Sequence, residues 1–143
     1  IMITIAVDFD GTIVTHEYPK IGEEIPFAIE TLKRLQSEIG CRLILWSVRS
    51  GKLLDEAVEY CLSKGLEFYA INKDFPEEEY DEASNRKINA DIYIDDRNVG
   101  GLPDWGVIYA MVKGQTRPIY DTQYIKPKPK NLIIRFGEWL AKR

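Results

Sequence analysis

Two carboxylates two residues apart, Asp8 and Asp10, follow an apolar segment near the start of the chain. Residues i and i+2 of a strand point to the same side, although a strand end can turn one of them outward. Two anions this close repel one another unless a cation or a shared proton joins them. Mg²⁺ suits such a site, because it prefers carboxylates together with water and substrate phosphate. An ordinary turn over Asp10-Gly11 is the alternative reading.

Apolar periodicity predicts the elements that position these carboxylates. Strands are predicted at 3–7, 41–46, 68–71 and 91–94, helices at 23–39 and 53–63, and an irregular segment at 72–89. Residues 107–111 fit either a fifth strand or the start of a last helix of the core. This alternation favours an α/β fold with a Rossmann-like parallel sheet sandwiched by helices. Ligands of such sheets bind outside the carboxyl ends of the strands.

Further polar residues stand at or just before the ends of the predicted strands. Ser47 ends the second strand, Asp95 and Asp96 end the fourth, and Lys87 lies in the loop before the fourth. Carboxylates, a hydroxyl and an ammonium group at one sheet edge are suited to phosphoryl transfer. Each also has a purely structural reading, in which Ser47 closes a turn, Lys87 is a solvated cation and the acidic pair opens a turn.

In these segments the sequence resembles the haloacid dehalogenase (HAD) superfamily of phosphotransferases. Asp8-Phe-Asp10-Gly-Thr12 resembles the first motif of that family, and Leu43–Ser47 resembles the second, an apolar strand that ends in Ser or Thr. Lys87 resembles the third motif, and Ile92–Asp96 resembles the fourth in its Asp-Asp form. The resemblance spans residues 3–113 and rests on the order and spacing of the four motifs.

The resemblance implies a role for each acidic residue. Asp8 is expected to be the nucleophile that forms an aspartyl-phosphate. Asp10 is expected to donate a proton to the leaving oxygen and later to take one from water, while its backbone carbonyl binds Mg²⁺. Asp96 is expected to be a metal ligand, and Asp95 a ligand either directly or through water. The expected metal-binding residues are therefore Asp8, Asp10, Asp95 and Asp96.

The phosphate-binding residues expected from the resemblance are Thr12, Ser47, Val48, Arg49 and Lys87. Ser47 would donate to a phosphoryl oxygen, the backbone N–H of Val48 would join the phosphate cradle, and Lys87 would neutralise charge near the nucleophile. Arg49 has two readings that the sequence does not separate. It can reach a substrate anion, or it can pair with Asp96.

A cap domain of the kind many HAD enzymes carry is not expected. Such caps enter at two points of the chain, which are filled here only by residues 13–23 and 72–86. Uncapped relatives often act on macromolecules or use a neighbouring subunit as a lid, so a large phosphorylated substrate is compatible with this chain. Residues 75–80 and the C-terminal segment are candidates for a cover. His16, the single histidine, is read as a surface loop residue.

Length and composition indicate one domain with a core. The chain has 143 residues, of which 45% are apolar, and its apolar runs are shorter than the about 20 residues of a membrane helix. We therefore expect a cytoplasmic protein with no membrane partner. Cys41 and Cys61 are predicted to be buried thiols. Nucleic acid is not expected as a partner, because the body of the chain is acidic.

Charge and composition change after residue 113. Residues 1–113 hold 21 acidic and 12 basic residues, whereas residues 114–143 hold 2 acidic and 7 basic ones. We therefore divide the chain into a HAD-like core domain, 1–113, and a C-terminal extension, 114–143. The extension contains a Pro- and Lys-rich segment and then an amphipathic helix at 132–142, which Asn131 would cap. Its apolar face should pack on the core or on a second copy, and the second case predicts a homo-oligomer.

Three classes of function are considered for a chain with these motifs. The first is a Mg²⁺-dependent phosphohydrolase that acts through Asp8. The second, a response-receiver module, is disfavoured by motif order, because here an acidic pair follows Lys87. The third is a HAD-fold protein that binds or assembles without catalysis.

Overall fold

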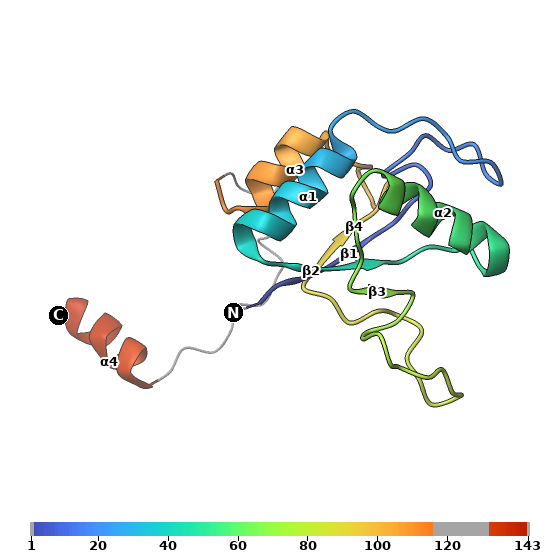
Figure 1. The fold of residues 1–143 in the computed structure, drawn as a ribbon. Helices are drawn as coiled ribbons and strands as arrows, with labels where there is room; N and C mark the ends of the chain where they lie inside the picture. Colours follow the sequence, from blue (N-terminus) through green and yellow to red (C-terminus); the bar gives the residue numbers. More distant parts are fainter. Residues whose placement is uncertain (1, 116–131, 143) are drawn as a thin grey trace.

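The structure is a computed structural model that describes residues 2–115 and 132–142, with side chains of the second range from Arg135 onward. Four parallel strands form one sheet in the order β3-β2-β1-β4 (Figure 1). Their bounds are Thr4–Val7 for β1, Arg42–Leu45 for β2, Ala70–Ile71 for β3 and Ile92–Ile94 for β4. The register aligns Val7 with Leu45 on one side and with Ile94 on the other. The α/β, Rossmann-like fold is confirmed.

Among the described residues, four helices accompany the sheet. They are α1 at Ala28–Ile39, α2 at Gly51–Ser63, α3 at Trp105–Val112 and α4 at Leu132–Ala141. Residues 107–111 therefore belong to a helix, and the alternative of a fifth strand was wrong. No helix in the described ranges has the length and apolar character needed to cross a bilayer. In Figure 1, α4 lies apart from the sheet and the other helices.

Helix α1 begins five residues later than the sequence pattern predicted, because the preceding segment pairs with the loop after β1. The N–H of Thr15 donates to the carbonyl of Glu23 (2.7 Å), and the N–H of Ile25 donates to the carbonyl of Ile13 (2.8 Å). Phe27 then starts the helix with a left-handed backbone, φ 67°. This short ribbon fixes the course of the chain directly after the two opening aspartates.

One face of the sheet packs against α1, α2 and α3. Alternate strand residues point to this face and form the larger apolar cluster with buried helix residues: Ile5, Val7, Leu43, Leu45, Leu32, Leu35, Ala57, Cys61, Trp105 and Ile108. Cys41 and Cys61 are both buried free thiols, as predicted. The strand order explains the arrangement, because right-handed crossovers from β1 to β2 and from β2 to β3 place α1 and α2 on the same side.

The opposite face differs from the expected second helical layer. It carries a smaller cluster around Ala6, Ile44, Ala70 and Ile88, in which no described helix takes part. The crossover from β3 back to β4 runs over this face as an irregular segment, 72–91, which projects below the sheet in Figure 1. Its acidic, polar sequence has too few apolar residues at helical spacing to form a packed helix.

Helix α3 reaches back to the loop after β1 through one buried side chain. The Nε1–H of Trp105 donates to the backbone carbonyl of Thr12 (3.1 Å), and both residues are fully or almost fully buried. A buried carbonyl without a partner is costly, so this contact holds the loop to the core.

We expect Trp105→Phe to lower the free energy of unfolding by about 2 kcal/mol, because it leaves the Thr12 carbonyl unpaired and removes buried ring atoms. Urea unfolding followed by circular dichroism measures the change. Trp139→Phe on α4 is the matched control, since Trp139 is half exposed, and it should change stability by less than about 0.5 kcal/mol. Equal effects of the two variants would contradict the role given to Trp105.

Candidate active site

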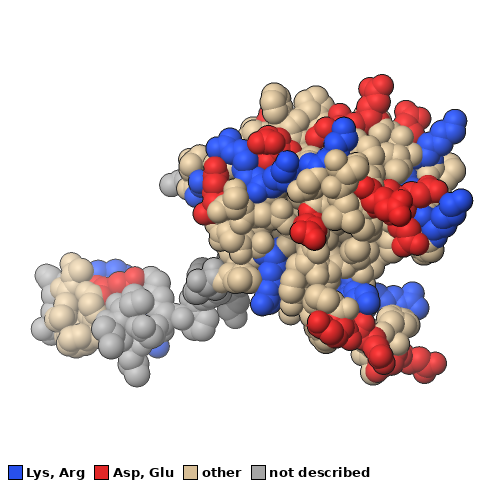
Figure 2. All heavy atoms as spheres, viewed as in Figure 1, with Lys and Arg blue, Asp and Glu red and all other residues tan. Residues whose placement is uncertain are grey.

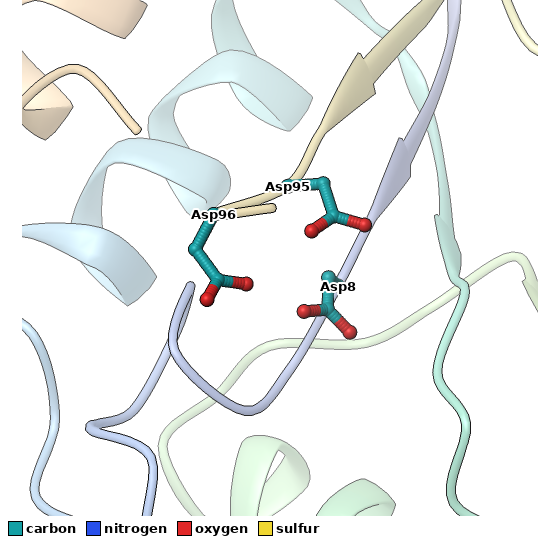
Figure 3. Close-up of side chains that lie close together, drawn as sticks. All are labelled: Asp8, Asp95 and Asp96. Atoms are coloured by element: carbon teal, nitrogen blue, oxygen red, sulfur yellow. The ribbon is translucent and has the colours of Figure 1, made fainter. Parts of the chain in front are cut away.

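Three carboxylates converge where two neighbouring strands end. Asp8 follows β1, and Asp95 and Asp96 follow β4. Because β1 and β4 are adjacent and parallel, their carboxyl ends lie side by side, and the three side chains point into one space (Figure 3). One carboxylate oxygen from each residue lies within 4.8 Å of the others. The predicted meeting of the first and fourth motifs is thus present in the fold.

Gly11 and Thr12 hold this acidic triad of Asp8, Asp95 and Asp96 together. The N–H of Asp96 donates to Thr12 Oγ1 (3.1 Å), and this hydroxyl lies 3.2 Å from Asp96 Oδ1 and 3.4 Å from Asp8 Oδ2. Its single proton can serve one carboxylate at a time. Gly11 has φ 83°, and a Cβ there would lie 2.3 Å from Asp96 Oδ2. The close approach therefore requires glycine.

The environment of Asp8 disfavours its charged form. Burial, followed by the neighbouring charges of Asp95 and Asp96, raises the pKa of Asp8 from 3.8 to about 7, although a backbone hydrogen bond from Phe9 acts in the opposite direction. A cation at the triad would relieve this repulsion. Three carboxylates are hard oxygen donors, which is the ligand set that Mg²⁺ takes together with water. The residues present therefore fit a magnesium ion, which Asp8, Asp95 and Asp96 would hold.

Asp10 turns away from the triad to a buried arginine. Arg49 Nε and Nη2 donate to the two oxygens of Asp10, each at 2.7 Å, and Arg49 is 1% exposed. Its guanidinium also donates to the carbonyls of Pro19, Lys20 and Leu53. A buried pair of this kind keeps its charges only because nearly every donor and acceptor is satisfied.

This pair changes two interpretations made from the sequence. Arg49 pairs with Asp10 and not with Asp96, and three backbone carbonyls occupy the rest of its guanidinium. The side chain of Asp10 is likewise directed to Arg49 and lies outside the triad. The expected contribution of Asp10 to metal binding was through its backbone carbonyl, and that remains a prediction.

The end of β2 carries Ser47 and Val48, and Val48 lines the cavity that holds Asp8 and Asp95. The N–H of Ser47 donates to Asn72 Oδ1 (2.8 Å), and Ser47 Oγ accepts from the N–H of Arg49 (3.1 Å). Ser47 therefore closes a turn, which is the structural alternative considered from the sequence. Its own hydroxyl proton is still available to a ligand. The side chain of Val48 is 91% exposed at the mouth of the site.

Lys87 is not placed at the triad. Its Nζ lies 4.9 Å from the centre of the Tyr93 ring, on the face opposite the helices. Within the described part of the chain, Lys87 forms no ion pair with a carboxylate. The irregular crossover 72–91 carries it along the second face of the sheet, and sequence spacing could not reveal this path.

A cavity of about 220 Å³ opens over the triad. It is lined by Asp8, Asp10, His16, Tyr18, Val48, Asp95 and Arg97. His16 is exposed, as expected of a loop residue, but it stands on the rim of the cavity. Sequence reasoning gave no role to Tyr18 or Arg97. The available signal was proximity, because these residues follow the first and fourth motifs within a few positions.

One comparison with solved structures identifies a relative. A conserved protein encoded by a locus of Bacteroides thetaiotaomicron is 66% identical over the match, which covers 82% of this chain and 94% of that one, with a TM-score of 0.76. The chain belongs to the same family as this Bacteroides protein. No model of a protein family matches the chain, and no curated protein does so. The relative's description names no activity, so the chemistry has to be argued from the site.

We expect the stability of the metal-free protein to fall as pH rises from about 4 to about 7. In this window folded Asp8 retains a proton that the unfolded chain releases, because its folded pKa is about 7 and its ordinary value is 3.8. Stability must then fall with rising pH, by on the order of 3 kcal/mol for this group alone. Thermal unfolding with EDTA, compared between wild type and Asp8→Asn, isolates this contribution.

Mg²⁺ should raise the melting temperature more at pH 8 than at pH 5, because its ligands must be ionised to bind it. Asp8→Asn should remove most of this increase, and the exposed control Asp55→Asn should retain it. An equal Mg²⁺ effect in wild type and Asp8→Asn would contradict a metal site at the triad.

Arg49→Met should lower the free energy of unfolding by about 3–5 kcal/mol, because it leaves the Asp10 carboxylate buried without its partner. Arg42→Met is the control, since Arg42 is exposed and lies over the Tyr69 ring, and it should cost less than about 1 kcal/mol. Urea unfolding of both variants, and of Arg49→Met/Asp10→Asn, gives the comparison. The double variant should recover part of the loss, and an additive further loss would contradict the pairing.

Proposed function

We propose that this protein is a Mg²⁺-dependent phosphohydrolase of the HAD type that acts through a phosphorylated Asp8. The observation that carries the proposal is the convergence of Asp8 with Asp95 and Asp96 at the ends of neighbouring parallel strands. A nucleophilic carboxylate beside a metal site is an arrangement suited to phosphoryl transfer through an aspartyl-phosphate. The four motifs that resemble those of the HAD superfamily supply the assignment of roles.

Asp8 would carry the covalent chemistry in two steps. In the first, an Asp8 oxygen attacks phosphorus, the bond from phosphorus to the leaving oxygen breaks, and an aspartyl-phosphate forms. In the second, water attacks phosphorus, the bond to Asp8 breaks, and inorganic phosphate leaves. When bound, Mg²⁺ offsets the negative charge of the carboxylates and of the phosphoryl oxygens.

Asp10 would move the protons of both steps, but its contacts set a condition. Both of its oxygens accept hydrogen bonds from Arg49. To give a proton to the leaving oxygen, or to take one from water, Asp10 would have to use the second lone pair of one of these oxygens, because the first accepts from Arg49. Ser47 would donate its free hydroxyl proton to a phosphoryl oxygen, and the N–H of Val48 would support the same group. Lys87 would have to leave the Tyr93 ring to take its expected role.

The Arg49–Asp10 pair is also the observation that favours the second candidate function, binding or assembly without turnover. A site that binds Mg²⁺ and a phosphate group while Asp10 stays locked would retain the ligand unchanged. The two candidates differ in one measurable quantity, which is the release of inorganic phosphate.

An open site suits a phosphorylated substrate that is larger than the cavity over the triad. In the described ranges no element lies over this cavity as a separate cap, and its rim consists of loop residues such as His16 and Tyr18. Loops that exclude water incompletely grip a small substrate weakly, so much of the recognition would come from surfaces beside the triad.

Asp8→Asn should reduce hydrolysis of p-nitrophenyl phosphate with Mg²⁺ by at least about 1,000-fold, because the amide cannot attack phosphorus. Release of p-nitrophenol measures turnover, and circular dichroism checks that the variant is folded. Asp55→Asn, an exposed change on α2, is the matched control and should retain wild-type activity.

Full activity of Asp8→Asn would refute Asp8 as the nucleophile. If folded, Mg²⁺-bound wild type released no phosphate from sugar phosphates, nucleotides or phosphopeptides, the binding function would replace the proposed hydrolysis.

A further inference from the structure

A second and larger cavity adjoins the candidate active site. Its volume is about 650 Å³, and it lies between the end of β2 and the irregular segment that follows β3. Its lining includes Ser47, Val48, Lys73, Glu78 and Arg86. Val48 also lines the cavity over the acidic triad. Val48, which is 91% exposed, therefore stands between the two hollows, and a ligand whose phosphoryl group lies near Asp8 would reach the second one by passing over it.

The walls of this cavity are tied together by specific hydrogen bonds. Asn72 joins them, since its Oδ1 accepts from the N–H of Ser47 (2.8 Å) and its Nδ2 donates to the carbonyl of Arg49 (3.4 Å). On the loop side, the N–H of Asp74 donates to Glu78 Oε2 and the N–H of Asn89 donates to Asp74 Oδ1, both at 2.7 Å. These hydrogen bonds give the irregular segment a defined conformation where it lines the cavity.

Charge is distributed unevenly on this wall. Lys73 and Arg86 line the cavity, and neither forms an ion pair with a carboxylate of the described residues. The Nζ of Lys73 has one hydrogen bond, to the carbonyl of Pro76 (3.5 Å). Glu78 is the one acid among the lining residues, and its carboxylate accepts from the N–H of Asp74. In Figure 2, the segment 72–91 that projects below the sheet carries basic side chains near the sheet and acidic side chains towards its tip.

We propose that this cavity binds a second anionic group of the substrate, so that the substrate class is phosphate compounds carrying a carboxylate or a further phosphate. Two cations without carboxylate partners, next to a site for a phosphoryl group, favour a ligand with negative charge at both ends. The third cation of the cavity lining, Arg49, does not contribute, because Asp10 and backbone carbonyls occupy its guanidinium. The position of the scissile phosphate rests on the proposed function, but binding of a two-headed anion does not require turnover.

The test uses phosphonates, which bind like phosphates and are not hydrolysed. Isothermal titration calorimetry with the full-length, Mg²⁺-saturated protein compares alkylphosphonates of two to four carbons with the matching phosphonocarboxylates and alkylene bisphosphonates. The phosphonocarboxylates and the bisphosphonates are two-headed, because each carries a second anionic group at the other end of the chain. Comparing these two classes shows whether the second group is a carboxylate or a phosphate. For at least one chain length we expect roughly tenfold tighter binding than for the alkylphosphonate, the sum of two exposed charge pairs.

The quantity compared between variants is the affinity for the ligand with two anionic groups divided by the affinity for the matching alkylphosphonate. Arg86→Gln and Lys73→Gln should each reduce this ratio severalfold, and the double variant should bring it near one. Lys142→Gln, an exposed charge change on the C-terminal segment, is the matched control and should leave the ratio unchanged. High salt should also lower the ratio in wild type, since exposed charges are screened. A ratio near one in wild type at every chain length, or a ratio that persists in the double variant, would overturn the proposal.

The same measurement separates this proposal from the proposed hydrolysis. If wild type hydrolyses no phosphate ester but retains the tenfold preference, the hydrolase assignment fails and the anion subsite stands. If wild type hydrolyses p-nitrophenyl phosphate and shows no preference for two-headed ligands, the subsite fails and the hydrolase assignment stands.

Discussion

Repulsion among Asp8, Asp95 and Asp96 is the constraint around which the rest of the site is built. Charges at this separation in a partly buried setting oppose one another strongly, and burial adds to the cost for Asp8. The fold keeps the three together through the parallel pairing of β1 with β4 and the buried hydroxyl of Thr12. Trp105 supports Thr12 from behind. Stability supplied by the apolar core thus maintains an acidic cluster that would separate in a free chain.

Asp8 and Asp10 show how two carboxylates two residues apart acquire different properties. Asp8 faces other anions, and its pKa rises to about 7. Asp10 faces Arg49, which also fastens the loop at Pro19 and Lys20 to the first turn of α2. The chain between them turns at the strand end, so the alternation that would place both on one side is broken. The same strand end therefore supplies one carboxylate suited to binding a cation, Asp8, and one that belongs to a structural ion pair, Asp10.

The sequence predicted the sheet and the convergence of the first and fourth motifs, because strand periodicity and the geometry of parallel sheets are local and general. It did not predict the partner of Arg49, because Asp10 and the loop carbonyls of Pro19 and Lys20 that fix its position are distant in the chain. It also did not predict the irregular layer on the second face or the place of Lys87, since segment 72–91 has no repeating pattern from which its path follows. His16, Tyr18 and Arg97 reach the rim through loop shape alone. The predicted cap residue Asn131 lies outside the described residues.

The positions of the lysine and arginine side chains explain why a cation that offsets the charge of the triad would have to come from solution. In the ranges that the structure describes, no lysine or arginine forms an ion pair with Asp8, Asp95 or Asp96. The guanidinium of Arg49 is committed to Asp10, and Lys87 lies over Tyr93, whose hydroxyl donates to the carbonyl of Ile88 and so belongs to the wall of the second face. Burial and the neighbouring charges of Asp95 and Asp96 disfavour the ionised form of Asp8 and raise its pKa. A divalent ion with oxygen ligands would offset the charge of the triad with two positive charges in one position, which a single side-chain cation cannot do.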